Sequence, residues 1–71
     1  MWPFVDGYPT LRQVIVNLKD SSSFRGVLWQ QRRGYVVLRN AELLKGRGEV
    51  VHMDGEIVVA TDNVAFLQVL P

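Results

Sequence analysis

Apolar and polar residues alternate most clearly between residues 14 and 38, where three apolar runs are separated by two polar turns. In the first run, Val14, Val16 and Leu18 fall on one face, and the residues between them fall on the other. A period of two is typical of a strand with one buried face. The pattern therefore predicts a first strand over Val14–Lys19.

The second and third runs predict two more strands, Phe24–Gln31 and Tyr35–Leu44, rich in β-branched and aromatic residues. Gly34 lies between them and is free to adopt the positive φ of a tight turn. Gly26 lies inside the second strand, where glycine usually marks a sharp bend or a bulge. We therefore expect a three-stranded meander whose middle strand bends, which is how a short sheet curls into a small barrel.

Two further strands follow a flexible hairpin tip at Lys45–Gly48. The fourth strand, Glu49–Ala60, is interrupted at Asp54–Gly55, which we interpret as a bulge or second bend. Thr61–Asn63 forms a tight turn into the fifth strand, Val64–Leu70.

The first thirteen residues contain two prolines and a glycine, so they cannot hold a long helix. We expect at most one helical turn, over Pro9–Gln13, and we expect Trp2 and Phe4 to cover an open end of the barrel. The predicted fold class is all-β: a small, strongly bent, open five-stranded barrel. Residues 1–71 form one domain, in which 1–13 are irregular and 14–70 form the barrel.

A chain of 71 residues buries only about 60% of its unfolded surface, so its stability as a monomer is marginal. Without cysteine it has no disulfide to compensate, and association with copies of itself is one source of the missing stability. No apolar run approaches the ~18 residues that span a bilayer, and the start lacks the features of a signal peptide. We expect a soluble protein of a reducing, cytoplasmic compartment.

No enzymatic activity, cofactor or metal is predicted. Ser21–Ser23 is interpreted as a polar turn, because no glycine-framed nucleophile elbow surrounds the serines. His52 has no cysteine and no second histidine with which to share a metal, and we expect a strand histidine that is exposed or hydrogen-bonded. Asp54 and Glu56 are expected to face solvent.

The charge distribution is uneven although the net charge is only +1. All eight basic residues lie between Arg12 and Arg47, and four acidic residues follow them. Three interpretations stay open: ordinary solvated faces, a surface that binds a polyanion, or a basic edge that meets the acidic edge of a neighbouring copy.

Three segments resemble the motifs of Sm and Lsm proteins. Leu18–Leu28 (LKDSSSFRGVL) resembles the first half of the first Sm motif, an apolar strand and polar turn followed by aromatic-x-Gly-x-Leu. Val36–Glu42 resembles its second half, and Ile57–Leu67 resembles the second Sm motif, in which an apolar run leads into a turn and the last strand. The resemblance spans about Val14–Leu70 and implies an open, bent five-stranded barrel that assembles into a homo-oligomeric ring.

In the family, strand four of one subunit pairs with strand five of the next. The resemblance implies that the interface residues are Ile57, Val58, Val59, Val64, Phe66 and Leu67. The residues agree with this implication, because the run 57–59 is apolar throughout and both of its faces should be covered. An apolar edge left bare favours aggregation, and closing a ring removes the edge.

The chain departs from the family where the family binds uridine-rich RNA. The Asp-x-x-Met-Asn segment between strands two and three corresponds to Gln31–Tyr35, which is one residue shorter and has no counterpart of the asparagine. Ala60–Thr61 replaces the Arg-Gly pair before the last turn, and the N-terminal helix is shortened or absent. The family's nucleotide pocket is therefore not carried over. These departures suggest a distant member of the family, and a bacterial or phage protein is one candidate.

The basic turn is the best candidate for binding. Arg32 and Arg33 can contact phosphates, and Tyr35 or Trp29 can stack on a base, with Thr61 in the position of the family's Arg-Gly pair. Alternatively, the two arginines only keep a tight turn solvated. We therefore expect a ring that binds single-stranded RNA with altered or weak specificity, or else a ring-forming structural or adaptor protein, for example phage-encoded, that has lost RNA binding.

Overall fold

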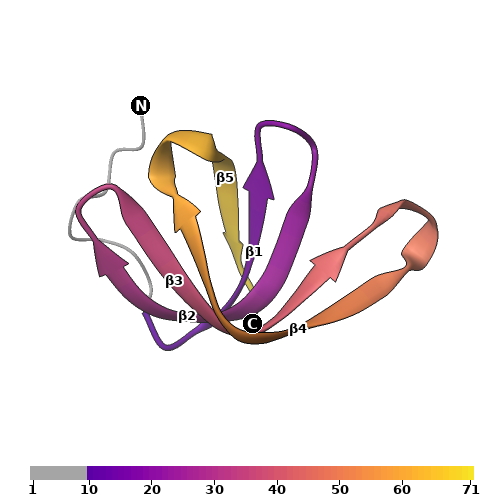
Figure 1. Cartoon of the computed structure of the whole chain (residues 1–71), viewed down its shortest axis with the longest axis horizontal. Coiled ribbons are helices and arrows are strands. Elements are labelled where there is room, and N and C mark those ends of the chain that lie inside the picture. The colour runs from indigo at the N-terminus through magenta and orange to yellow at the C-terminus, as the bar shows by residue number, and fades with distance from the viewer. Residues whose placement is uncertain (1–9) are drawn as a thin grey trace.

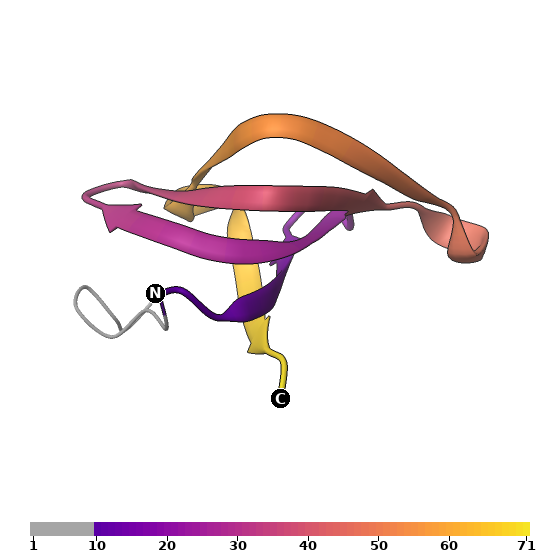
Figure 2. The same ribbon diagram turned by 90° about the horizontal axis from the view of Figure 1, so that it is seen from below.

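The computed structural model describes residues 10–71, which form one antiparallel sheet of five strands (Figure 1). The strands are β1 (Gln13–Leu18), β2 (Ser23–Arg32), β3 (Tyr35–Leu44), β4 (Val50–Ala60) and β5 (Val64–Val69). Their order in the sheet is β4-β3-β2-β1-β5, so β4 and β5 are the two edges. The sheet is bent, and β5 crosses behind the long strands (Figure 2). The predicted all-β fold with five strands is confirmed.

The core lies on the inner face of the bent sheet. Val14 and Val16 of β1 are fully buried, as the alternation along the first strand predicted. Leu28 and Leu38 lie opposite each other on β2 and β3 and are the largest fully buried side chains. The cluster of buried residues consists of Val14, Val16, Leu28, Val36, Leu38, Ala41, Val59 and Val64.

The bend in β2 lies at Gly26, as predicted. The pairing of β2 with β3 shifts register between Arg25 and Val27. A Cβ atom at Gly26 would lie 2.9 Å from the carbonyl oxygen of Arg39 and 3.1 Å from the Cα of Ala41. Only glycine lets the two backbones approach this closely.

The predicted interruption of the fourth strand is a β-bulge. The pairing of β3 with β4 shifts between Arg39 and Ala41, so that Asp54 and Gly55 of β4 lie opposite the single residue Asn40. Gly55 has a φ of +79° and Asn40 a φ of +51°, and these are residues that tolerate the left-handed region.

Beyond the bulge, residues 42–52 form a hairpin arm that projects from the barrel (Figure 1). The arm contains the end of β3 and the start of β4, which are joined at the tip by a 3-10 turn, η1 (Gly46–Gly48). The backbone N–H of Lys45 donates to the carbonyl oxygen of Glu49 at 2.8 Å and closes the tip. The tip predicted from the sequence is therefore the end of a long hairpin.

Several strand ends differ from the prediction by one residue. β1 ends at Leu18, and the N–H of the next residue, Lys19, donates to the carbonyl oxygen of Asn63 at 2.8 Å. Ser23 belongs to β2 and not to the preceding turn, and β5 ends at Val69. The predicted tight turn before β5 is a second 3-10 turn, η2 (Thr61–Asn63).

No helical turn forms over residues 10–13. Thr10 and Leu11 form a turn in which Leu11 has a φ of +62° and donates its N–H to the carbonyl oxygen of Leu28 at 2.6 Å. The covering role predicted for Trp2 and Phe4 lies outside the described residues. Within residues 10–71, no helix is long and apolar enough to cross a membrane.

Gly26→Ala is expected to lower the free energy of unfolding by about 1–3 kcal/mol, because its Cβ would meet backbone atoms of β3 that cannot move aside. Gly46→Ala is the matched control, since a Cβ there meets nothing within 4 Å and its φ is not positive. The measurement is a urea titration of both variants at one protein concentration. Equal stability of the two variants would contradict the close approach of the strands.

Candidate functional site

The β2–β3 turn and the β4–β5 turn lie together at one end of the barrel. Arg32 pairs with Tyr35 across the first turn, which leaves Arg33 and Gly34 as its central residues. Gly34 adopts a φ of +87°, as predicted for this turn. The N–H of Thr61 donates to the carbonyl oxygen of Gly34 at 3.0 Å. This bond brings together four of the five residues predicted to bind RNA.

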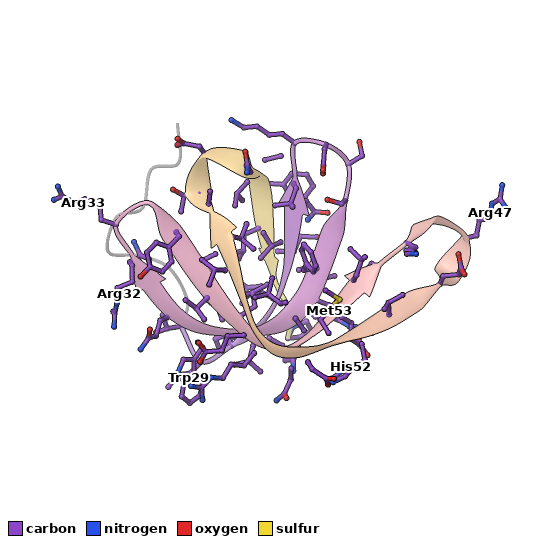
Figure 3. The ribbon with its side chains drawn as sticks, in the orientation of Figure 1. Trp29, Arg32, Arg33, Arg47, His52 and Met53 are labelled. Carbon is purple, nitrogen blue, oxygen red and sulfur yellow. The ribbon has the colours of Figure 1, made fainter. Side chains whose placement is uncertain are left out.

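The side chains of the first turn face solvent. Arg32 donates from Nη1 to the carbonyl oxygen of Gln31 at 3.4 Å, and Arg33 makes no hydrogen bond or ion pair within residues 10–71. Figure 3 shows Arg33 extending away from the barrel. Tyr35 keeps 37% of its surface exposed. The turn therefore presents positive charge next to an aromatic ring, and no acidic side chain of the described residues neutralises it.

Trp29 lies apart from these four residues, farther along β2 (Figure 3). The guanidinium carbon of Arg39 lies 3.8 Å from the centre of the Trp29 ring. Arg39 also donates from Nε to Oε2 of Glu56 at 2.8 Å. One face of the indole is thus occupied by a cation that is itself paired. The sequence did not predict this stack, because it depends on a register shift of β2 against β3 between Leu28 and Gln30.

Two basic residues in the middle of strands form ion pairs across the sheet, whereas the basic residues in the turns between strands form none within residues 10–71. Arg25 forms an ion pair with Glu42, and Arg39 forms one with Glu56. Within the described part of the chain, four other basic side chains make no hydrogen bond or ion pair: Lys19, Arg33, Lys45 and Arg47. All four lie in the turns between strands. Part of the uneven charge seen in the sequence is therefore cancelled by pairing across neighbouring strands.

A third connection, the β1–β2 turn, lies beside η2 through the bond from Lys19 to Asn63. Asp20 in this turn accepts hydrogen bonds from the hydroxyl and the backbone N–H of Ser22. These bonds stabilise the carboxylate and so lower the pKa of Asp20 below its ordinary value, and the bond from the hydroxyl has the larger effect. Leu18, Lys19, Asp20 and Asn63 line a shallow hollow between the turns. Ser21 and Ser22 thus lie in a polar turn, as predicted, whereas Ser23 begins β2.

His52 is an exposed strand histidine, as predicted, and its Nε2 lies 3.4 Å from Oδ1 of Asp54. Asp54 and Glu56 both face solvent, as predicted. Among the residues that the structure describes, no group of three or more histidine, aspartate or glutamate side chains could hold a metal ion.

The two edge strands contain the residues predicted to form an interface between subunits. Within residues 10–71, β4 pairs only with β3 and β5 pairs only with β1. Val58 is 62% exposed and Phe66 is 54% exposed. The other four side chains turn inward: Ile57 and Leu67 pack partly buried against the core, and Val59 and Val64 belong to it. Val58 and Phe66 are therefore the predicted residues whose side chains are available to a neighbour.

The chain is similar to known Sm proteins along most of its length. It is 44% identical over 59 residues to an Sm-like snRNP protein of Methanosarcina barkeri, a match that covers 76% of this chain and 75% of that protein. No protein-family model matches the chain.

Solved structures of Sm proteins have the same fold. A heptameric archaeal Sm protein superposes with a TM-score of 0.76 at 34% identity, covering 86% of this chain and 88% of that one. The Sm heptamer of P. aerophilum gives 0.77 at 34% identity, covering 86% and 81%. A Pyrococcus abyssii Sm protein, solved in complex with a uridine heptamer, gives 0.76 at 37% identity and covers 86% of each chain.

Arg39→Ala is expected to cost about 0.5–1 kcal/mol more in free energy of unfolding than Arg25→Ala. Both substitutions remove an ion pair of similar exposure, but only Arg39 also stacks on Trp29. Urea titrations of both variants measure the difference, which should vanish when the pair is compared in a Trp29→Ala background. A difference that persists without the indole would exclude the stack as its cause.

Proposed function

We propose, since this chain belongs to the Sm-like protein family, that it assembles into a closed homo-oligomeric ring and binds single-stranded RNA at the end of the barrel that carries the β2–β3 turn. The family predicted from the sequence is confirmed. The similar proteins include archaeal Sm proteins and lend no support to a bacterial or phage origin. The proposal includes that the protein acts in the cytoplasm, and that it acts by binding and not as an enzyme.

One observation supports RNA binding most directly: the hydrogen bond from Thr61 to Gly34 fixes the exposed β2–β3 turn against the β4–β5 turn. The arrangement holds the unpaired Arg33 and the exposed ring of Tyr35 at the same end of the barrel. Cations beside an accessible aromatic ring suit single-stranded nucleic acid, because phosphates and base faces are available together. The Pyrococcus abyssii protein, which is 37% identical, was solved with a uridine heptamer.

Weak base selectivity follows from the residues that the turn contains. Arginine contacts to phosphates carry no sequence information, and stacking tolerates every base. Gln31–Tyr35 offers no asparagine, and Ala60–Thr61 offers no arginine, to hydrogen-bond a base edge. Trp29 remains a secondary candidate, because Arg39 already occupies one face of its ring.

Ring assembly is supported by the two free edges of the sheet. The edge strand β4 exposes Val58 and the edge strand β5 exposes Phe66, and pairing β4 of one copy with β5 of the next would cover both. Because the two edges differ, the contact is head-to-tail and generates a ring when its rotation closes. Similar structures at 34% identity are heptamers.

The second candidate is a ring that has lost RNA binding and acts as a structural or adaptor protein. Ala60–Thr61 in place of the family's Arg-Gly pair favours it, because a lost pocket residue is what such a protein would show. The two candidates predict the same assembly and differ only in binding, so they are separated by the RNA measurement below.

Val58→Lys is expected to lower the mass measured by light scattering toward that of the 8.1 kDa chain, because it places a charge on the proposed interface. Val50→Lys is the matched control, since Val50 is an exposed valine of the same strand on the hairpin arm. Dissociation of both variants would move the interface toward the arm. A monomeric wild-type protein at micromolar concentration would exclude the ring.

Arg32→Ala combined with Arg33→Ala is expected to weaken binding to all homopolymer RNAs alike. It should reduce the slope of log affinity against log salt by about 0.7 for each lost phosphate contact. Tyr35→Ala should lower affinity by about 1–3 kcal/mol with little change of slope, because stacking is not a charge effect. The measurement is filter binding across a salt series, after light scattering has shown that each variant still assembles.

Two outcomes would revise this function. A wild-type ring that binds no RNA at low salt would favour the structural or adaptor protein. Binding to oligouridine far tighter than to oligoadenosine or oligocytidine would contradict weak selectivity and require a base-specific pocket.

A further inference from the structure

We infer that the tip of the hairpin arm is a second contact for RNA phosphates, separate from the β2–β3 turn and formed by Lys45 and Arg47. This inference rests on the proposed RNA binding and extends it to a second place on each subunit. Two of the four basic side chains that make no hydrogen bond or ion pair within residues 10–71 lie at this one tip.

The tip is built to expose its cations. Arg47 adopts a φ of +69°, in the left-handed region, between Gly46 and Gly48. A Cβ added at either glycine would meet nothing within 4 Å, so no described part of the chain covers the tip. Figure 3 shows Arg47 pointing away from the barrel at the end of the arm. A non-glycine residue in this conformation costs free energy, and within the described residues the side chain of Arg47 makes no hydrogen bond or ion pair that would offset that cost.

The tip and the β2–β3 turn are electrostatically independent. They lie at opposite ends of β3, and ten strand residues span roughly 30 Å. That length agrees with the longest dimension of the chain, 33 Å. The Debye length at physiological salt is only about 8 Å. The cations at the tip therefore add nothing to binding at the turn unless one ligand reaches both places.

A long, flexible polyanion is the ligand that fits this separation. A small anion would contact only one place, whereas a single strand bound at the turn can run along the subunit to the tip. Glu49 is the acidic residue next to the tip, and only its backbone carbonyl is engaged, with Lys45. Two cations against one unpaired carboxylate leave the tip with a net positive charge that a substitution can raise or lower.

The test compares a long oligouridine with a uridine tetramer, which is too short to reach from turn to tip. Lys45→Ala combined with Arg47→Ala should reduce the salt slope for the long RNA by about 1.4, which is about 0.7 for each of two contacts. The affinity of this variant for the long RNA at 0.1 M salt should fall about 25-fold, since each lost contact amounts to a factor of about 5 per tenfold change in salt. The tetramer should bind as to wild type.

Glu49→Gln is the opposite variant, and it should raise affinity for the long RNA while leaving the tetramer unchanged. Its amide keeps the size of the side chain, and the carbonyl that closes the tip is untouched. Light scattering on each variant shows whether assembly is preserved. Equal effects on both RNAs would indicate a general change in the electrostatic field of the protein and would overturn the inference of a second contact. No effect on either RNA would overturn it as well.

Lysine acetylation read by mass spectrometry gives a direct second measurement. The chain has two lysines, Lys19 near the turns and Lys45 at the tip. Long RNA should protect Lys45 from acetylation in wild type, and the tetramer should leave it reactive. A Lys45 that stays fully reactive under saturating long RNA would overturn the inference.

The experiment separates this inference from the proposed site at the turn. Loss of long-RNA binding in the tip variant, with no effect of the Arg32 and Arg33 substitutions, would support the tip and reject the turn. The reverse result would reject the tip and leave the turn in place. A wild-type ring that binds neither RNA would reject both.

Discussion

The close approach of β2 to β3 at Gly26 is the constraint on which the rest of the structure depends. With the carbonyl oxygen of Arg39 only 2.9 Å from where a Cβ would lie, the sheet can bend there, and it closes over Leu28 and Leu38. Thr61 reaches the β2–β3 turn because the register of β3 with β4 pairs Tyr35 with Ala60, the residue before Thr61. A site made of two turns far apart in sequence thus depends on the pairing of β3 with β4, within a sheet that bends at Gly26.

The sequence could predict the strands and this bend because both follow from local patterns. Period-two alternation located β1, and a glycine inside an apolar run located the bend in β2. The stack of Arg39 on Trp29 could not be predicted, because it requires the cross-strand register. Register is set by bulges on several strands at once, and a shift of one residue moves a side chain to the other face.

The candidate site was predictable in part for the same reason. The exposed cations and the aromatic ring of the β2–β3 turn are neighbours in the sequence, so their adjacency along the chain was enough to group them. The inward orientation of Val59 and the outward orientation of Val58 were not, because an apolar run has no alternation to assign its faces. The apolar run predicted that a partner was needed, but only the fold shows which side chains are free to meet one.

Assembly and binding are linked in the proposed function because each contact is weak alone. A phosphate contact is screened by salt, and a stacked base adds about 1–3 kcal/mol. Copies of the turn held in a ring act on one strand at a high effective concentration, so small contributions combine without any new contact. Pairing of the free edges β4 and β5 between subunits would then have two effects. It would cover the exposed apolar surface at Val58 and Phe66, and it would repeat around the ring a binding site that is too weak in a monomer. A substitution that opens the ring, such as Val58→Lys, should therefore weaken binding to long RNA, even though neither Val58 nor Phe66 is among the proposed RNA contacts.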